Sequence, residues 1–285
     1  YKRQISDLRD LFIRITNAIR EHDDKRILFI EGNGYANDFT GLTPPWDPNM
    51  AYSFHKYKTF NSHFTLEFVL KIQREYNYPL WMGESGENSN AWATDAVKLF
   101  EDLGIGWSWW TYKKLGSVTN PVSFNSNSRY DALVSYIKGE SSSKPTLDNI
   151  YAGLLELAES TKIENVNFQR DYIDALVRQP YSNLTVPYSN NKVPGTIYAS
   201  DFDLGNNLNA YYDTNSYDFE YSTGTYQASN SFIYRNDGVD VNSTTFSAGN
   251  GFCIEHIDKG EWAVYTINVE NDGLYDIGIF FSSTS

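Results

Sequence analysis

Residues 27–30 read Ile-Leu-Phe-Ile, an apolar run between Arg26 and Glu31. An uninterrupted apolar run of this length is typical of a parallel strand that other elements cover on both faces. We therefore predict a fully buried strand at this position, and the pattern on either side of it decides the fold class.

An amphipathic helix is predicted ahead of this strand, ending near residues 22–24. Its apolar residues recur at helical spacing, while arginines occupy the other faces. The stripe expected to face inward consists of Ile5, Leu8, Phe12, Ile15 and Ile19.

Further strands are predicted at 51–55, 79–83 and 105–110, so the four strand starts are almost evenly spaced. A helix is predicted over 64–76, and another follows the third strand. The residues expected to face inward are Leu66, Val69, Leu70 and Tyr76 in the first helix and Trp92, Ala96, Leu99, Phe100 and Leu103 in the second. This regularity is expected of successive βα units in a parallel barrel or a doubly wound sheet.

Four strands do not close an eight-stranded barrel, a fold that takes about 250 residues. The pattern therefore leaves two possibilities, an open sheet or one half of a (β/α)8 TIM barrel. The chain starts at Tyr1 with no initiator Met and no signal segment, and we expect it to be a fragment.

A helical appendage follows this α/β region. The polar stretch at 140–145 ends one helix and precedes another. The residues expected to face inward in the second helix are Ile150, Leu154, Leu157 and Ala158.

The amino-acid composition changes near Val193, beyond which Asn, Asp, Gly, Ser and Tyr are dominant. Apolar residues alternate over 263–269, and Asn271-Asp272-Gly273 is a strong hairpin signal before 275–277. These features predict an all-β module. The fold class is thus α/β followed by all-β, with an α/β domain at 1–140, a helical connector at 141–192 and a partial β-sandwich at 193–285.

Composition excludes several classes of protein. The 285-residue chain has 36 acidic and 23 basic side chains, a net charge of −13, which disfavours nucleic acid and anionic membranes as partners. No apolar run is long enough to span a bilayer. The single Cys253 excludes an internal disulfide and a Cys-rich zinc site. The 22 Tyr and 7 Trp offer flat surfaces for ligands such as sugars.

Side chains at the carboxyl ends of the predicted strands could form a site. In a parallel barrel these ends face the active site. They carry Glu31 with Asn33, His55 with Tyr57, Glu84, and Trp107, Trp109 and Trp110 with Lys113. Carboxylates, a histidine and tryptophans together suit a site that binds and attacks a sugar.

Simpler interpretations remain open for each of these residues. Glu31 could cap the next helix, and His55 or any one Trp could be structural. The polar turn at 84–90 could serve to cap the helix after it, and for Glu87 we favour that interpretation.

Three motifs in this order resemble the last half of a glycoside hydrolase family 5 catalytic domain, the cellulase-like branch of the retaining (β/α)8 hydrolases. They are His55-Lys56-Tyr57, the segment 80–86 (Leu-Trp-Met-Gly-Glu-Ser-Gly) and the segment 106–113 (Gly-Trp-Ser-Trp-Trp-Thr-Tyr-Lys). The resemblance covers about residues 1–140 and implies that the four strands are the fifth to eighth of a barrel.

The resemblance also implies roles for single residues. Glu84 matches the nucleophile, and His55 and Tyr57 match the pair that contacts substrate and orients that carboxylate. Trp110 matches the aromatic floor beneath the sugar. Trp46, on the loop before the second strand, is either an extension of the cleft or a packing residue.

A retaining hydrolase needs a second carboxyl group as acid and base, about 5–5.5 Å from the nucleophile. The resemblance implies that this group belongs to an Asn-Glu motif ahead of Tyr1, and no such pair followed by a helix occurs later in the chain. We therefore expect the chain by itself not to hydrolyse glycosides. Glu31 and Glu87 are poor substitutes because each would need a different geometry.

The module at 193–285 resembles the first part of a carbohydrate-binding module of family 6, a β-sandwich jelly roll. The motifs are residues 197–203, 234–240 and 260–265. The resemblance implies that Tyr234 is one wall of a sugar slot, with strand packing as the alternative. Ser200 stands where many members have a calcium-associated Glu, so a structural calcium is doubtful although Asp201 could compensate. Trp262 is assigned to the sandwich core.

Together these observations predict a retaining glycoside hydrolase of β-1,4-linked polysaccharide, cellulose or another β-glucan, with an appended carbohydrate-binding module. Mannan, xylan or xyloglucan as substrate, or a carbohydrate-binding protein without catalysis, are the alternatives. We expect no catalytic cofactor or metal, a monomer in the intact protein, and an extracellular, periplasmic or cell-surface location.

Overall fold

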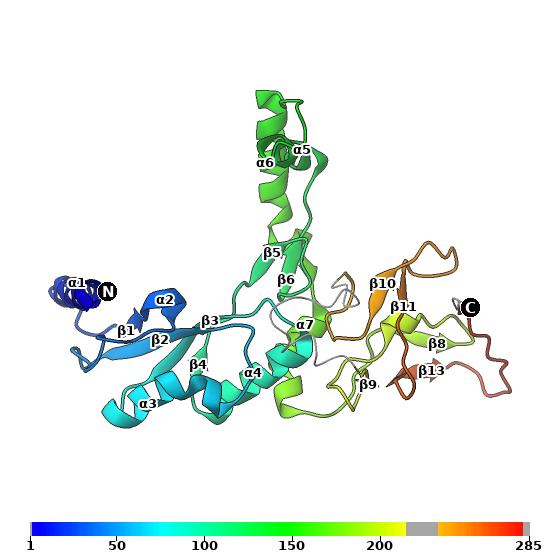
Figure 1. Cartoon of the computed structure of the whole chain (residues 1–285). Coiled ribbons are helices and arrows are strands. Elements are labelled where there is room, and N and C mark those ends of the chain that lie inside the picture. The colour runs from blue at the N-terminus through cyan, green and yellow to red at the C-terminus, as the bar shows by residue number, and fades with distance from the viewer. Residues whose placement is uncertain (1, 215–232, 282–285) are drawn as a thin grey trace.

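The computed structural model describes residues 2–214 and 233–281 of the chain, with the side chains of the first helix described from residue 7 onward (Figure 1). Its amino-terminal part is α/β. Helix α1 (Lys2–Arg20) precedes a sheet of four parallel strands in the order β1 (Leu28–Glu31), β2 (Met50–Lys56), β3 (Leu80–Ser85) and β4 (Gly106–Trp107). This parallel order confirms the predicted succession of strands.

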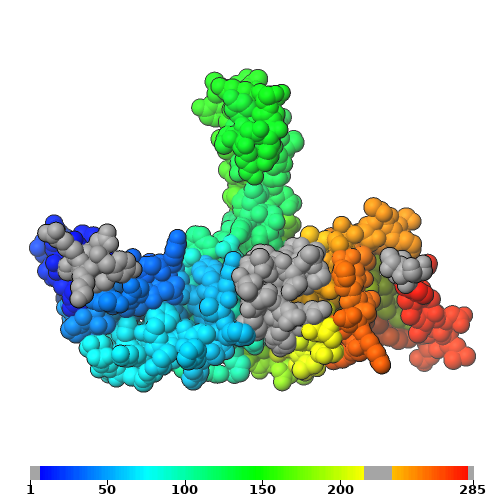
Figure 2. Space-filling model, in the orientation of Figure 1, coloured from blue at the N-terminus to red at the C-terminus, as the bar shows by residue number. Residues whose placement is uncertain are grey.

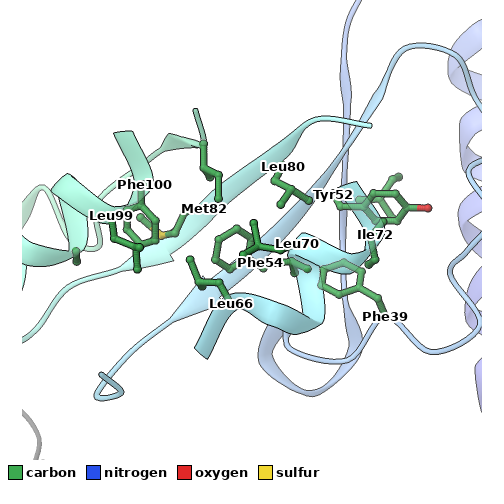
Figure 3. Packing of buried hydrophobic residues seen from close by; sticks show 14 of the residues in the cluster. Phe39, Tyr52, Phe54, Leu66, Leu70, Ile72, Leu80, Met82, Leu99 and Phe100 are labelled. Carbon is green, nitrogen blue, oxygen red and sulfur yellow. The ribbon is translucent and has the colours of Figure 1, made fainter. Parts of the chain in front are cut away.

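The main core lies between this sheet and two helices on one of its faces, α3 (Glu67–Tyr76) and α4 (Asn90–Asp102). Figure 3 shows Phe54 of β2 among the side chains of Leu66, Leu70 and Leu80. The predicted inward residues of both helices pack in this cluster. Trp92, Ala96 and Phe100 of α4 are fully buried. Apolar spacing was thus sufficient to identify the core face.

The prediction of a fully buried first strand is wrong. Ile27 and Phe29 are each about half exposed, because β1 is an edge strand and α3 and α4 cover only one face of the sheet. Phe29 finds one partner on the open face, the ring of Trp81 at 5.4 Å. In α1, Leu8 and Phe12 pack on the core as predicted, but Ile15 and Ile19 are exposed. The side chain of Ile5 lies outside the described part.

The fourth strand is shorter than the predicted 105–110. Beyond Trp107 the chain stays beside β3, but through single contacts, the amide of Ser108 to Met82 O and that of Trp110 to Ser85 O. The Trp110–Thr111 peptide is cis. The chain then leaves this sheet.

A small second sheet and a helical hairpin follow, and neither the sheet nor its strands were predicted. The sheet contains β5 (Lys113–Leu115), β6 (Val122–Phe124) and β7 (Asn167–Phe168). From it rise α5 (Ser128–Ile137) and α6 (Leu147–Ser160), which stand away from the rest of the molecule (Figures 1 and 2).

The two helices of the hairpin approach closely at Gly153, where a Cβ would lie 2.8 Å from Cβ of Arg129. The predicted inward stripe of α6 is wrong for Leu154 and Ala158, which are exposed. A lone pair of helices covers only one narrow face of each, so most of the apolar side chains of α6 remain in contact with solvent.

Helix α7 (Arg170–Val177) returns to the α/β part and packs on α4. The Thr94 hydroxyl donates to Ala175 O at 2.9 Å, and Tyr172 is fully buried. Part of the predicted connector therefore packs against the first domain. The domain boundaries themselves stay predictions.

The carboxyl-terminal part contains short strands of two or three residues each. They are β8 (Asn191–Val193), β9 (Tyr211–Tyr212), β10 (Val241–Ser243), β11 (Phe252–Ile254), β12 (Trp262–Ala263) and β13 (Ile267–Val269). They pair as β10 with β11, β12 with β9 and β13 with β8. The first two pairs contribute to a small core that includes Phe202, Tyr211 and Val241. A jelly-roll sandwich stays a prediction.

Two predictions for this part are wrong. Residues 274–281 form no strand, so no hairpin follows Val269, and Ile267–Val269 pairs instead in parallel with β8. The turn signal at 271–273 is local, whereas a hairpin also needs a surface to bury its apolar side chains, and Ile277 is 88% exposed. Trp262 is not in a core but is 42% exposed on β12.

The remaining elements are short. They are α2 (Asn33–Ala36) and the 3₁₀ turns η1 (His63–Leu66), η2 (Ile163–Asn165), η3 (Gln179–Tyr181) and η4 (Ala199–Asp201). None of the helices in the described ranges combines the length and apolarity needed to cross a bilayer.

Candidate active site

The site lies at the carboxyl ends of β2 and β3. His55 and Glu84 are register partners there, after an irregularity in the pairing between Phe54 and His55 at which β3 contains the extra residue Gly83. A Cβ at Gly83 would lie 2.3 Å from the Ser53 hydroxyl oxygen, so a larger residue here would have to move the Ser53 side chain. The extra residue brings His55 opposite Glu84.

A hydrogen bond joins Tyr57 to Glu84. The phenol hydroxyl donates to Glu84 Oε1 at 2.8 Å. Burial, reinforced by this bond, raises the pKa of the Tyr57 hydroxyl, so it keeps its proton across the physiological range. The Tyr57 hydroxyl is therefore a neutral donor to Glu84, and a carboxylate is the form of this side chain that can attack an electrophile.

His55 bridges two carboxylates. Its Nε2 lies 3.2 Å from Glu31 Oε1 and 3.8 Å from Glu84 Oε2. The His55 side chain is only 15% exposed, whereas Glu31 is 54% and Glu84 32% exposed. The imidazole is therefore fixed beneath two carboxylates that a ligand can reach from solvent.

Glu31 belongs to this cluster and does not cap a helix. The short helix α2 that follows it has Gly32 at its N-cap and no side-chain cap. Ser53 donates a long hydrogen bond of 3.4 Å to Glu31 Oε1. The alternative of a capping role for Glu31 is thus wrong, and its contact with His55 was not predicted.

Trp110 follows β4 by three residues, and its side chain is half exposed. Its amide donates to Ser85 O at 2.7 Å, one residue after Glu84. Gly86 has φ +141°, and a Cβ there would lie 2.0 Å from the Trp110 carbonyl oxygen. Gly86 is therefore required for the backbone contact that holds the Trp110 segment beside Glu84.

The two neighbouring tryptophans have structural partners. Trp107 donates through Nε1 to Glu101 and Trp109 donates through Nε1 to the Tyr172 hydroxyl, both at 2.8 Å. Of the three tryptophans, Trp110 is the most exposed.

The polar turn after Glu84 caps the helix that follows it, as its sequence suggested. Ser89 is the N-cap of α4 and accepts a hydrogen bond from the Trp92 amide at 3.2 Å. Glu87 forms an ion pair with Lys114.

Four other predicted residues make their contacts away from the Glu84 site. Lys113 donates to Thr161 O, and the Asn33 side chain accepts from the Gly34 amide in its own turn. Trp46 donates to Thr16 and stacks on Phe12, so it packs against α1 on the loop that enters β2 at the end opposite His55. Tyr234 stacks on Phe252 at 4.2 Å and donates to Asp201. Their substrate contacts stay predictions.

Within residues 2–214 and 233–281, no group of three or more His, Cys, Asp or Glu side chains could hold a metal ion. The carboxylates at the Glu84 site are bridged by one histidine only.

Comparisons with known proteins give the following matches. The family model for cellulase (glycosyl hydrolase family 5) matches residues 3–116. A β-xylosidase of Phanerodontia chrysosporium is 25% identical over an alignment of 140 positions, and the match covers 36% of this chain and 29% of that protein. The chain thus spans less than a third of the length of this curated relative.

Solved structures with a similar arrangement include enzymes and a synthase subunit. An endoglucanase is 17% identical with a TM-score of 0.32, covering 37% of this chain and 46% of its own. An endo-β-1,4-glucanase of Xanthomonas axonopodis pv. citri is 19% identical with a TM-score of 0.31, covering 37% and 44%. The cellulose synthase subunit Z of Clostridioides difficile is 16% identical with a TM-score of 0.35, covering 56% and 52%.

Residues 3–116 include all four parallel strands and the Glu84 site. This α/β segment, with its parallel sheet, therefore matches glycosyl hydrolase family 5.

Proposed function

We propose that this chain is part of a retaining glycoside hydrolase that cleaves a β-1,4-linked polysaccharide, cellulose or another β-glucan. The observation that carries the proposal is the hydrogen bond from Tyr57 to Glu84 Oε1, with His55 beside the other carboxylate oxygen. This arrangement lies within the segment that matches the cellulase family.

In the proposed mechanism Glu84 is the nucleophile. Its carboxylate attacks the anomeric carbon, the bond to the leaving oxygen breaks, and a second carboxyl group protonates that oxygen. Water, deprotonated by the same second group, then releases the sugar from Glu84 with net retention. The second group is expected in the Asn-Glu motif that the family resemblance implies. The two-carboxylate mechanism needs no cofactor.

Tyr57 and His55 would hold Glu84 in this mechanism. The Tyr57 hydroxyl occupies Oε1 and leaves Oε2, which faces His55, free to attack. The exposed ring of Trp110 would lie beneath the sugar, where its electron-rich face favours the positive charge that develops on the pyranose.

The substrate could also be a xylan, mannan or xyloglucan. The β-xylosidase relative favours a xylose-containing polymer among these alternatives. The carboxyl-terminal part would be a carbohydrate-binding module, with Tyr234 as one wall of its sugar slot. The intact protein would be a monomer, and a polymeric substrate favours action outside the cell, in the periplasm or at the cell surface.

The test uses the protein expressed together with whatever sequence its gene places ahead of Tyr1. A 2-deoxy-2-fluoroglycoside with a good leaving group should label the peptide that contains Glu84, because fluorine at C2 slows the second step. Mass spectrometry locates the label. Assays on carboxymethyl cellulose, xylan, mannan and xyloglucan then identify the polymer.

Glu84→Gln should abolish turnover, and Glu87→Gln, the same change in the same turn, should leave most of it. A label on another residue, or full activity of Glu84→Gln, would contradict the assignment of the nucleophile. Polymer binding without hydrolysis by the unchanged protein would favour the carbohydrate-binding alternative.

A further inference from the structure

A buried lysine, Lys56, ends β2 between His55 and Tyr57, the two residues that contact Glu84. Lys56 is 4% exposed, although it carries an ammonium group at the end of a four-carbon chain. His55 and Tyr57 point toward the carboxylates, and Lys56 projects to the opposite face, as strand alternation requires. The mechanism proposed above does not use it.

All three protons of the Lys56 ammonium have an acceptor in the loop that follows Tyr57. Nζ lies 3.1 Å from Thr59 O, 2.8 Å from the Thr59 hydroxyl oxygen and 3.0 Å from Phe60 O. It also lies 5.2 Å from the ring centroid of Trp92. In the described ranges Lys56 forms no ion pair with a carboxylate.

The loop has a second attachment at the same place. Trp92 Nε1 donates to Thr59 O at 3.0 Å, and Asn61 Nδ2 donates to Trp92 O at 3.0 Å. Trp92 is fully buried in α4. Lys56 and Trp92 therefore tie residues 59–61 to the rigid body of the domain, although Thr59 and Phe60 are themselves exposed.

A lysine is a costly way to fill a buried position. Desolvation lowers the pKa of Lys56 to about 7. Burial is the sole cause of the lowered pKa, and the side chains of His55 and Glu84 lie on the other face of the sheet. If packing alone were needed, an apolar side chain would serve at lower cost. The hydrogen bonds from the Lys56 ammonium to Thr59 and Phe60 are something that an apolar side chain could not form.

We propose that Lys56 is a positioning residue: by holding Thr59 and Phe60 it fixes the loop after β2 and so keeps the Tyr57 hydroxyl on Glu84. Its catalytic consequence rests on the proposed function, but the position of Tyr57 does not. Residue 57 is the first residue after β2, so its backbone has only the strand on one side and this loop on the other to restrain it.

The first experiment observes Tyr57 directly and needs no activity. The full chain is labelled with [ζ-¹³C]tyrosine, and the Tyr57 resonance is assigned by its loss in Tyr57→Phe. Lys56→Met should shift or broaden this resonance. Lys58→Met is the matched control, because Lys58 is an exposed lysine of the same loop, and it should leave the resonance unchanged.

Thr59→Val provides a second variant in case Lys56→Met does not fold. It removes one acceptor at an exposed position and should shift the Tyr57 resonance in the same direction, by less. An unchanged resonance in Lys56→Met, or in Thr59→Val where the former is unfolded, would overturn the proposal.

The second experiment is a double-mutant cycle on an active form of the protein. Lys56→Met should lower kcat about tenfold with little change in KM when Tyr57 is present, and by less than about twofold in the Tyr57→Phe background. Equal losses in both backgrounds would mean that Lys56 does not act through Tyr57. If the protein has no glycosidase activity, the proposed function fails, and the resonance of Tyr57 still decides the role of Lys56.

Discussion

The side-chain amide of Asn90 donates a hydrogen bond of 2.8 Å to Asp237, a residue 147 positions further along the chain. Asn90 is the first residue of α4, the helix that follows the Glu84 turn, and it is 1% exposed. The same amide donates to Asp171 at 2.9 Å. Asn236 completes the contact by donating to the Asn90 side-chain oxygen at 3.2 Å. The start of α4 is thus joined both to α7 and to the carboxyl-terminal part.

Asn90→Ala should therefore destabilise the whole protein. Asp171 and Asn236 keep other hydrogen bonds, but Asp237 Oδ1 loses its donor, and a buried group left unsatisfied costs about 1–3 kcal/mol. Thermal unfolding followed by circular dichroism should show a clear fall in Tm. Asn17→Ala, at an exposed position of α1, is the control and should change Tm little. Equal Tm values for the two variants would show that the junction contributes nothing.

Arg235→Met tests the charge at the centre of the same junction. The Arg235 side chain is fully buried, lies 2.6 Å from Asp237 and 3.9 Å from Asp171, and is covered by the rings of Tyr188 and Phe202. Removing the cation leaves two buried carboxylates together, at a cost of about 3–5 kcal/mol.

Desolvation already raises the pKa of Asp237 to about 6, so without Arg235 its ionised form becomes still less favourable. Urea denaturation at pH 7 measures the loss. Adding Asp237→Asn to Arg235→Met should restore part of the stability, because it removes one of the unpaired charges. A double variant less stable than the single variant would contradict this account.

Much of the α/β part could be predicted from sequence because its signals are local. Apolar runs and helical stripes identify β1 to β3, α3 and α4, and residues after parallel strands gather at one edge, which brought Glu84, His55 and Tyr57 together. The contact between Glu31 and His55 could not be predicted, since it depends on side-chain direction in two strands 24 residues apart.

The rest of the fold depends on contacts that leave no periodic signal. The docking of α7 rests on single pairs such as Asn90 with Asp171, 81 residues apart. Strands of two or three residues in the carboxyl-terminal part are too short for alternation to identify. The predicted hairpin at 271–273 shows the same limit, because turn chemistry alone does not supply a partner surface.

Gly86→Ala adds only one methyl group, but it should displace the backbone segments that carry Glu84 and Trp110. A Cβ at this position meets the Trp110 carbonyl oxygen at 2.0 Å, so the segments of Glu84 and Trp110 must separate. Gly104→Ala is the control, because Gly104 has φ +64° with no atom within 4 Å of its Cβ and so isolates backbone strain, about 1 kcal/mol. Gly86→Ala should lose more stability than this and also weaken oligosaccharide binding, measured by calorimetry. Equal effects of the two changes would contradict the steric argument.

Tyr57→Phe removes the donor to Glu84 Oε1 without changing the shape of the ring. A hydrogen bond to a charged group contributes about 1.5–3 kcal/mol, so an active form of the protein should lose roughly 10- to 100-fold in kcat. KM should change little if the hydroxyl acts on Glu84 and not on the substrate. Tyr151→Phe, at an exposed position of α6, should leave kcat unchanged. A rise in KM with kcat retained would mean that the hydroxyl binds substrate instead.

Asp95 on α4 should make stability depend on pH. Desolvation raises its pKa to about 6 from an ordinary value of 3.8, with a small opposing effect of Lys98. The folded protein therefore retains this proton at a pH where the unfolded chain has lost it, and stability falls as the pH rises from about 4 to about 6. Above pH 6 the ionised carboxylate is a cost on the order of 2 kcal/mol.

Asp95→Asn removes that cost, so it should stabilise the protein at pH 7 and have little effect at pH 4. Asp10→Asn, which changes an exposed aspartate of α1, provides the comparison and should have little effect at either pH. Denaturation midpoints at the two pH values give the measurement. A gain for Asp95→Asn that is as large at pH 4 as at pH 7 would mean that packing, not ionisation, limits stability at this position.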